Sequence, residues 1–154
     1  MNIVDYTAPE RVIILENSTK TDALTELAQA SSSCLYSTEH FLSAILNRED
    51  LLSTGVGFET AFPHSKTDSV IDFFVTIGIS QEGIDWQSVD NQPVKLIFLI
   101  GGLIEEQEKY LKILAALSKI TNKQENRQNM LEVKDPAEIY SQFCKSAIIE
   151  SQAI

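Results

Sequence analysis

Residues 94–100 read VKLIFLI, an almost unbroken apolar run that follows Pro93 and ends at the pair Gly101-Gly102. The run has the length of a β-strand, and neighbouring positions, which point to opposite faces of a sheet, are both apolar. This pattern is typical of a strand buried on both faces. The rest of the chain must therefore supply a sheet with a covering layer on each side.

Two further segments are predicted to be strands of this sheet. β-Branched residues cluster at residues 11–15, and residues 70–79 carry apolar side chains with period two. Only the polar connection 81–93 separates the strand at 70–79 from the strand at 94–100. Because strands that follow one another in sequence usually lie side by side, we expect these two to be neighbours.

Four helices are predicted from capping residues and helical spacing: from a cap at residues 18–21, from residues 37–38, over about 104–121, and from the pair Asp135-Pro136. Residues 122–129 form a short helix or a loop. Helices and strands alternate along the chain. This order predicts an α/β three-layer sandwich with a mostly parallel or mixed sheet, in a single domain over residues 1–154.

The composition limits the classes of function. The formal net charge is −10, which argues against nucleic-acid binding and suits either a basic protein partner or simple solubility. No apolar run approaches 18 residues and the start of the chain lacks a signal-peptide pattern, so we expect no membrane insertion and a cytoplasmic protein. Cys34 and Cys144 are then expected to be thiols.

His64 is the candidate nucleophile. Pro63 fixes its own φ and disfavours helix at Phe62, so residues 58–62 are predicted to be a strand that ends at a corner, with His64 just beyond it. A neutral imidazole nitrogen is available near pH 7 and forms phosphohistidine when it attacks phosphorus. The alternative is an ordinary surface or core histidine, and the Pro-His pair by itself does not decide between them.

Arg48 is the candidate phosphate-binding cation. It continues the apolar spacing of Phe41 and Ile45, which predicts that it faces the protein body, and a guanidinium matches phosphate oxygens. The alternative is a cation at a helix end that binds the last carbonyl groups or pairs with a neighbouring carboxylate. Additional donors are predicted around residues 53–57, from the Ser53 and Thr54 hydroxyls and the amides near Gly55 and Gly57. A plain turn is the alternative for this Gly-x-Gly segment.

Residues 47–64 (NREDLLSTGVGFETAFPH) resemble the active-site signature of the type 2 enzyme IIA (EIIA) domains of the bacterial phosphotransferase system (PTS), the fructose/mannitol and nitrogen-regulatory group. Later segments match the same family in order: residues 83–86 (GIDW), 93–100 (PVKLIFLI) and 110–117 (YLKILAAL). The resemblance therefore covers nearly the whole chain.

The resemblance implies a mixed, roughly five-stranded sheet with helices on both faces. It implies that His64 is phosphorylated and that Arg48 assists. The phosphoryl donor would be the phosphohistidine of HPr or of its nitrogen-branch relative. The acceptor in a transporter would be a cysteine of a IIB domain. A regulatory protein would instead control a target protein and would have no sugar substrate. No cofactor is expected, and no metal-ligand spacing is present.

The chain departs from the family pattern at three positions. Tyr110 stands where many members have a second histidine, and a tyrosine donates a hydrogen bond but carries no positive charge at pH 7. Phe58 and Glu59 replace smaller residues and are expected to narrow access to the nucleophile. His40 is expected on the solvated side of its helix and does not replace the missing histidine.

Three functions remain open from the sequence. The first is a phosphoryl carrier in sugar uptake, and the second a regulatory binding module whose phosphorylation state switches its protein partners. The third is a degenerate paralogue that keeps the fold without the relay, which the tyrosine at position 110 motivates. The chain itself cannot specify a sugar, because a IIA domain contacts phosphate and protein surfaces.

Overall fold

The computed structural model describes residues 1–152 of the 154-residue chain. Its strands are β1 (Val12–Ile14), β2 (Gly55–Gly57), β3 (Thr60–Ala61), β4 (His64–Lys66), β5 (Phe74–Ile84) and β6 (Val94–Gly102). Its α-helices are α1 (Lys20–Ala30), α2 (Thr38–Leu51), α3 (Gln107–Thr121), α4 (Gln124–Leu131) and α5 (Pro136–Gln152). Short 3₁₀ helices occupy Ile3–Tyr6, Pro9–Arg11 and Ser32–Cys34.

The strands form one mixed sheet in the order β1-β5-β6-β3-β2, and β4 also pairs with β6. Strands β3 and β4 both run parallel to β6 and share one register: Thr60 lies opposite Leu96 and His64 opposite Ile100, an offset of 36 residues in each case (96 − 60 and 100 − 64). They are thus two parts of one strand position, interrupted at Phe62-Pro63 because proline has no N–H for the ladder. The expected five strand positions are filled by six strands.

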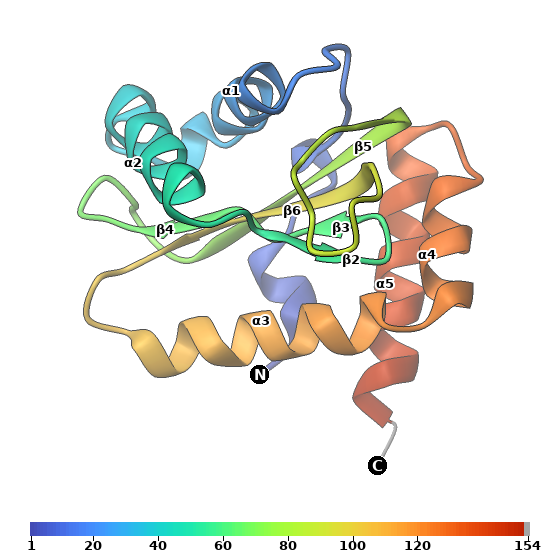
Figure 1. The fold of residues 1–154 in the computed structure, drawn as a ribbon. Helices are drawn as coiled ribbons and strands as arrows, with labels where there is room; N and C mark the ends of the chain where they lie inside the picture. Colours follow the sequence, from blue (N-terminus) through green and yellow to red (C-terminus); the bar gives the residue numbers. More distant parts are fainter. Residues whose placement is uncertain (153–154) are drawn as a thin grey trace.

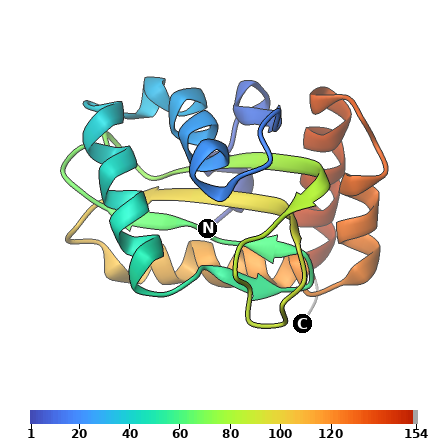
Figure 2. The same cartoon turned by 45° about the horizontal axis from the view of Figure 1, so that its top comes forward.

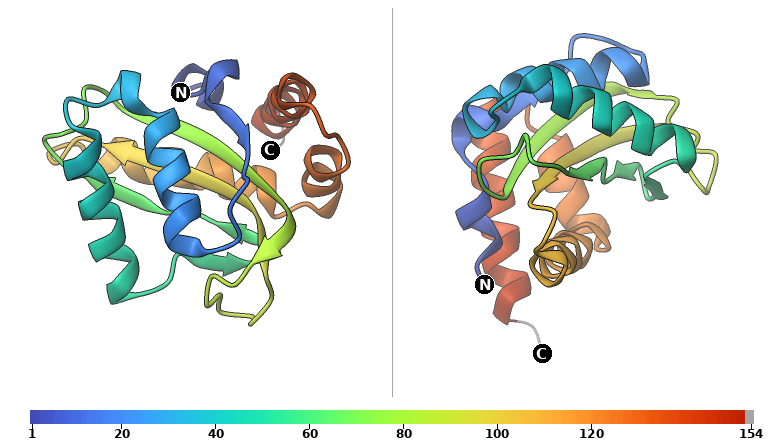
Figure 3. Two further views of the ribbon diagram at one scale, coloured as in Figure 1. Left: turned by 90° about the horizontal axis from the view of Figure 1, so that it is seen from above. Right: turned by 90° about the vertical axis from the view of Figure 1, so that its left-hand side faces the viewer.

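Helices cover both faces of the sheet, as predicted (Figure 1). Helices α1 and α2 lie across one face, which Figure 2 shows from that side. Helix α3 runs under the other face, and the views in Figure 3 place α4 and α5 together beside it. The α/β three-layer arrangement expected from the element order is therefore confirmed.

The core consists of two apolar clusters separated by the sheet. Along β6, Leu96, Phe98 and Ile100 face α3 and α5, whereas Ile97 and Leu99 face α1 and α2, and all five are 0% exposed. The prediction that this strand is buried on both faces is confirmed. At about 25 cal/mol per Å² of apolar surface, burial of side chains of this size contributes about 1.5–3 kcal/mol each.

Strand β5 starts later than the predicted strand and is also buried on both faces. Ile71, predicted in the strand, is 45% exposed and precedes it. Thr76 is 0% exposed, and its hydroxyl lies 2.6 Å from the Ser31 hydroxyl, which satisfies both groups under α1. A Cβ on Gly78 would lie 2.8 Å from Leu27, so the glycine allows α1 to pack closely on the sheet.

The helix starts follow the predicted caps. Thr19 accepts a hydrogen bond from the Asp22 amide at the start of α1, and Ser37 accepts one from the His40 amide at the start of α2. Helix α3 begins at Gln107, three residues later than expected, and its buried side is formed by Tyr110, Ile113, Leu117, Ile120 and Thr121. Leu111, on the opposite side, is 51% exposed.

The Gly-Val-Gly segment, for which a plain turn was the alternative interpretation, is strand β2. It pairs antiparallel with β3, and the two residues between them, Phe58 and Glu59, have φ of 57° and 61°. Two left-handed residues in a two-residue loop define a type I′ hairpin, which usually contains Asn-Gly. The predicted strand over residues 58–62 is accordingly reduced to Thr60–Ala61.

Candidate functional site

His64 is the first residue of β4, on the strand position interrupted by Pro63. The Ile100 amide donates to the Pro63 carbonyl oxygen at 2.9 Å, so β6 fixes the backbone immediately before the histidine. Helix α2 packs against β4 on one side and α3 lies on the other (Figure 1). The sequence placed His64 beyond a strand end; the structure instead places it inside the sheet ladder, where its backbone is held on both sides of the corner.

The hydrogen bond of the imidazole defines its reactive nitrogen. Nδ1 of His64 lies 2.9 Å from the carbonyl oxygen of Phe62. A carbonyl oxygen only accepts, so Nδ1 carries the proton and the lone pair of the neutral ring is on Nε2. Burial is the main cause that lowers the pKa of His64, and the charges of Arg48 and Lys66 lower it further, whereas the bond to Phe62 and the charge of Glu49 act in the opposite direction. The ring is therefore kept neutral, with a nucleophilic Nε2.

Arg48 combines the two interpretations of its sequence position. Its Nη1 donates to the carbonyl oxygen of Leu52 at 2.8 Å, which is the helix-end bond expected as the alternative. Its charge also lowers the pKa of both His64 and Tyr110, and α2 packs against β4, the strand that carries His64. Because a guanidinium has five N–H donors in a planar fork, one bond to a carbonyl leaves donors for an anion.

Tyr110 lies beside the nucleophile, where the resemblance placed it. The centroids of the His64 and Tyr110 rings are 5.0 Å apart. Burial raises the pKa of Tyr110, and the charge of Arg48 opposes this shift. The phenol is consequently neutral at pH 7 and adds a hydrogen-bond donor but no charge.

Lys66 is a site residue that the sequence interpretation missed. Its Nζ lies 5.4 Å from the centroid of the Tyr110 ring, and it donates a hydrogen bond to Oε1 of Gln107 at the start of α3. Strand alternation could have identified it, because residues two apart on a strand point to the same face and His64 is two residues earlier.

Glu49, rather than Arg48, is the charged residue that α2 buries most deeply. Its carboxylate lies 2.7 Å from Nζ of Lys20 and accepts hydrogen bonds from the amide of Thr54, at 2.9 Å, and from the Thr54 hydroxyl. Nε1 of Trp86 donates to the same hydroxyl oxygen at 3.2 Å. Spacing contained this signal, because Glu49 follows the buried Ile45 by four residues.

The predicted donors around residues 53–57 have other partners. The amide and hydroxyl of Thr54 both bind Glu49, and the amide of Gly55 donates to the Ser53 hydroxyl at 3.1 Å. A Cβ on Gly55 would lie 2.2 Å from Oγ of Ser88, so this glycine permits close packing. Gly57 has φ of 95° and shapes the hairpin. The Thr54 and Gly55 donors are thus already bonded within the protein.

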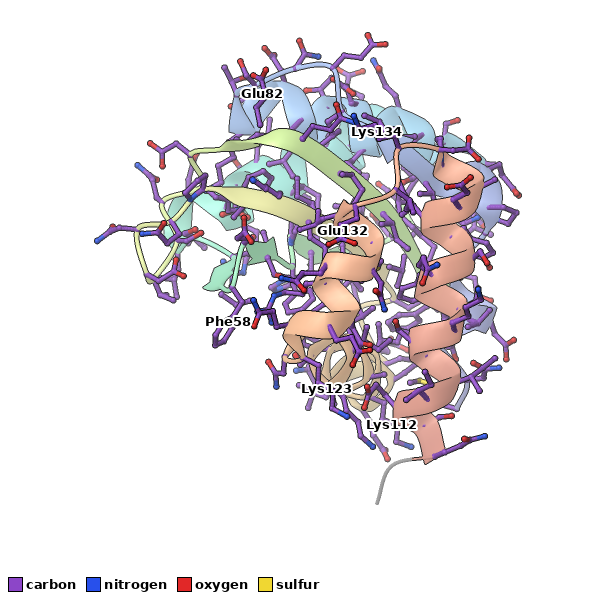
Figure 4. All side chains as sticks on the ribbon, turned by 90° about the vertical axis from the view of Figure 1, so that its right-hand side faces the viewer. Phe58, Glu82, Lys112, Lys123, Glu132 and Lys134 are labelled. Carbon is purple, nitrogen blue, oxygen red and sulfur yellow. The ribbon has the colours of Figure 1, made fainter. Side chains whose placement is uncertain are left out.

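Phe58 does not lie over the nucleophile. Its ring stacks against the guanidinium of Arg127 in α4, with 4.9 Å between the ring centroid and Cζ (Figure 4). It also lines a small hollow with Leu114, Ser118 and Thr121, toward the C-terminal half of α3. The expected narrowing of access to His64 is therefore not produced by this side chain.

The remaining predicted residues lie away from His64. His40 is exposed on α2, as expected. Trp86 is 0% exposed and packs in the core under α1. Cys34 and Cys144 are free thiols. Within residues 1–152, no cluster of histidine, cysteine and carboxylate side chains is arranged to hold a metal ion. In the same residues, no helix is both long enough and apolar enough to cross a membrane.

Comparison with known proteins identifies the family. The family model described as "Phosphoenolpyruvate-dependent sugar phosphotransferase system, EIIA 2" matches residues 6–146. The chain is 39% identical to a PTS fructose-specific EIIABC component of Bacillus subtilis over 94 residues, which are 61% of this chain and 15% of that protein. It is 32% identical to a nitrogen regulatory protein of Bradyrhizobium diazoefficiens over 143 residues, 92% of this chain and 94% of that protein.

Solved structures share the fold. The nitrogen regulatory protein IIA-Ntr of Neisseria meningitidis superposes with a TM-score of 0.84 at 21% identity, over 91% of this chain and 97% of that one. Enzyme IIAMTL, from its complex with phosphorylated enzyme IIBMTL of Escherichia coli, superposes with a TM-score of 0.76 at 17% identity, over 90% and 96%. At these identities the likeness concerns the fold.

Proposed function

Because this chain belongs to the EIIA 2 family of the phosphoenolpyruvate-dependent sugar phosphotransferase system, we propose that it carries a phosphoryl group on Nε2 of His64. One observation supports this proposal above the others: the 2.9 Å hydrogen bond from Nδ1 to the Phe62 carbonyl leaves Nε2 as the nitrogen with the lone pair. A nucleophile that is neutral, oriented and half-buried is what transfer to nitrogen requires.

The proposed step moves one phosphoryl group between two imidazoles. A bond forms between Nε2 of His64 and phosphorus while the phosphorus–nitrogen bond of the donor breaks, and its electron pair returns to the donor nitrogen. No proton has to move on His64 during attack, because the proton stays on Nδ1, which keeps donating it to the Phe62 carbonyl oxygen. The new positive charge on the ring is balanced by the phosphoryl group that it carries.

Catalysis by the protein then consists of positioning and charge stabilisation, as in other phosphoryl transfers. The guanidinium of Arg48 supplies positive charge, and the neutral phenol of Tyr110 supplies a hydrogen-bond donor beside the ring. Thr54, Gly55 and Gly57 have supporting roles, and Thr54 is bonded to Glu49.

The proposed partners are proteins. The donor is the phosphohistidine of HPr or an HPr-like protein of the nitrogen branch, and the acceptor is a cysteine of a IIB domain. The Escherichia coli complex, in which enzyme IIAMTL is bound to phosphorylated enzyme IIBMTL, supports a IIB domain as the partner that receives the group. We place the reaction in the cytoplasm, which suits two free cysteines.

A regulatory role is the second candidate. It is favoured by the extent of the similarity along this chain, since the nitrogen regulatory protein matches 92% of it and the fructose EIIABC component 61%. In this role the phosphoryl group on His64 changes which target proteins bind, and the group leaves by hydrolysis or by return to the donor.

A labelling experiment tests phosphorylation of His64, the step that both candidate roles share. The protein is incubated with labelled phosphoenolpyruvate, enzyme I and HPr, and acid-labile, base-stable label is measured. We expect the unsubstituted protein to be labelled and His64→Ala to carry no label. The matched control is His40→Ala, which removes the other histidine of the chain and is expected to leave labelling unchanged. Label that persists in His64→Ala contradicts the assignment.

A second measurement separates the two roles. Labelled protein is purified and mixed with a IIB domain of a fructose-type system. Transfer of the label to the IIB cysteine supports a role in uptake. Label that stays on His64, while labelled and unlabelled protein capture different targets, supports the regulatory role.

A further inference from the structure

We infer that Lys66 binds the phosphoryl group on His64 and supplies the positive charge that Tyr110 lacks. This inference rests on the proposed function. It starts from the placement of three side chains. The centroid of the Tyr110 ring lies 5.0 Å from the centroid of the His64 ring and 5.4 Å from Nζ of Lys66.

The backbone brings Lys66 to the nucleophile. His64 and Lys66 are the first and third residues of β4, so their side chains leave the same face of the strand, with Cα atoms about 6.6 Å apart at 3.3 Å per residue. Both pair with β6, opposite Ile100 and Gly102. The spacing is therefore fixed by the sheet ladder.

The neighbouring residues hold the ammonium between β4 and the start of α3. A Cβ on Gly102 would lie 3.2 Å from Cγ of Lys66, so the glycine leaves room for the stem of the lysine. The ammonium reaches α3, where it donates to Gln107 and lies against the Tyr110 ring, a position stabilised by the negative face of the ring. Lys66 is half-buried in this position.

The charge balance at the site requires a second cation. A phosphoryl group on nitrogen carries about two negative charges near neutral pH, by analogy with other protein phosphates, and Arg48 contributes one positive charge. Tyr110 is neutral, because burial raises its pKa. An ammonium has three N–H donors, so Lys66 can keep its bond to Gln107 and still donate to a phosphoryl oxygen. Arg48 comes from α2 and Lys66 from β4, so the two cations belong to different elements that pack against each other.

Two substitutions and one matched control test this role. Lys66→Gln removes the charge and Lys66→Arg restores it. Lys112→Gln removes one charge from the exposed side of α3, where the lysine pairs with Glu108 at 3.4 Å, and controls for the effect of net charge on association with the donor. Each protein is phosphorylated once by HPr and once by the small donor phosphoramidate, which needs no docking surface.

We expect Lys66→Gln to slow phosphorylation by about tenfold with both donors, less than the 10²–10³ typical of a fully enclosed oxyanion donor. Lys66→Arg should recover most of the rate, and Lys112→Gln should react with phosphoramidate like the unsubstituted protein. The pKa of His64, followed by NMR in a chain with two histidines, should rise in Lys66→Gln because a nearby cation has been removed. A merely structural lysine would not produce this shift together with rescue by arginine.

The outcomes separate this inference from the proposed function. Normal phosphorylation of Lys66→Gln with both donors, at the rate of Lys112→Gln, overturns the role of Lys66 and leaves the assignment of His64 intact. A loss seen with HPr and not with phosphoramidate also overturns it, because the lysine then serves docking. If neither donor labels the unsubstituted protein, both proposals are overturned.

Discussion

The rings of His64 and Tyr110 lie 5.0 Å apart at their centroids and are tilted by 41°, so the phenol occupies the space immediately beside the nucleophile. Tyr110 comes from the first turns of α3 and is 6% exposed, whereas His64 is half-buried on β4. The position that carries a second histidine in many family members is thus filled by a group of similar size and different charge.

Tyr110→His is expected to speed phosphoryl transfer to His64 by about tenfold, because an imidazolium stabilises the arriving charge better than a neutral phenol. Single-turnover labelling by HPr measures this rate. Tyr110→Phe is the matched control, since it keeps the ring and removes only the hydroxyl donor. Unchanged kinetics in Tyr110→His would show that the tyrosine does not limit transfer.

The effects of Tyr110→His and Lys66→Gln should be non-additive. If the lysine supplies charge that the tyrosine lacks, its removal costs less once an imidazolium stands beside the phosphoryl group. The four proteins of a double-mutant cycle are compared by their phosphoramidate rates. Additive effects would mean that the two side chains act on the reaction independently.

His64 should titrate below the usual value of about 6.5 for histidine, chiefly because burial disfavours its charged form. Phosphorylation should therefore persist as the pH falls just below 6.5, where an exposed histidine is largely protonated. The unfolded chain binds this proton more tightly than the folded one, so the associated stability is complete above about pH 6.5 and is lost as the pH falls toward the folded-state pKa. NMR titration of His64, with exposed His40 as the internal comparison, measures the shift.

Glu49→Gln should destabilise the protein by about 2 kcal/mol, because it leaves the ammonium of Lys20 without its carboxylate in a largely buried place. Urea unfolding followed by the fluorescence of Trp86, the single tryptophan, measures this change. Glu108→Gln is the control: its carboxylate is 86% exposed and pairs at the surface, so we expect a change within about 0.5 kcal/mol. Equal stabilities of the two variants would contradict the structural role of the buried pair.

Glu59→Gly should be more stable than Glu59→Ala by about 1 kcal/mol, because a left-handed backbone costs a residue with a Cβ about 1–2 kcal/mol. Both variants lose the carboxylate that lies 3.6 Å from Lys95, so the comparison isolates the φ of 61° at this position. Thermal unfolding of the pair is the measurement. Equal stabilities of Glu59→Ala and Glu59→Gly would mean that the hairpin loop does not require a left-handed backbone at this position.

The sequence predicted those parts of the fold that depend on local pattern. The apolar run of β6, the caps at Thr19 and Ser37, and the start of α5 were found because each signal lies within a few residues. The hairpin at Phe58-Glu59 was not found from the sequence, because neither residue is typical of a left-handed turn. Its conformation is imposed by pairing of β2 with β3, which is a tertiary effect.

The site was predicted in part. Residue pattern and the family resemblance pointed to His64 and Arg48, and the resemblance alone to Tyr110. The structure places Tyr110 beside His64, and the charge of Arg48 acts on both. Lys66 and Glu49 were missed, since their roles depend on which strand face and which helix face turn inward. Glu49 in particular was hidden by the assumption that Arg48 continues the buried side of α2.

The unbroken register of β3 and β4 has a consequence for how a phosphorylated form is recognised. The backbone of the nucleophile is held by β6 on both sides of Pro63, so there is no hinge at this point that a phosphoryl group can push. We expect the phosphorylated and unphosphorylated proteins to have the same main-chain shape here. A partner that tells them apart must then sense an altered electric potential on a rigid surface, and its discrimination should weaken as salt is raised.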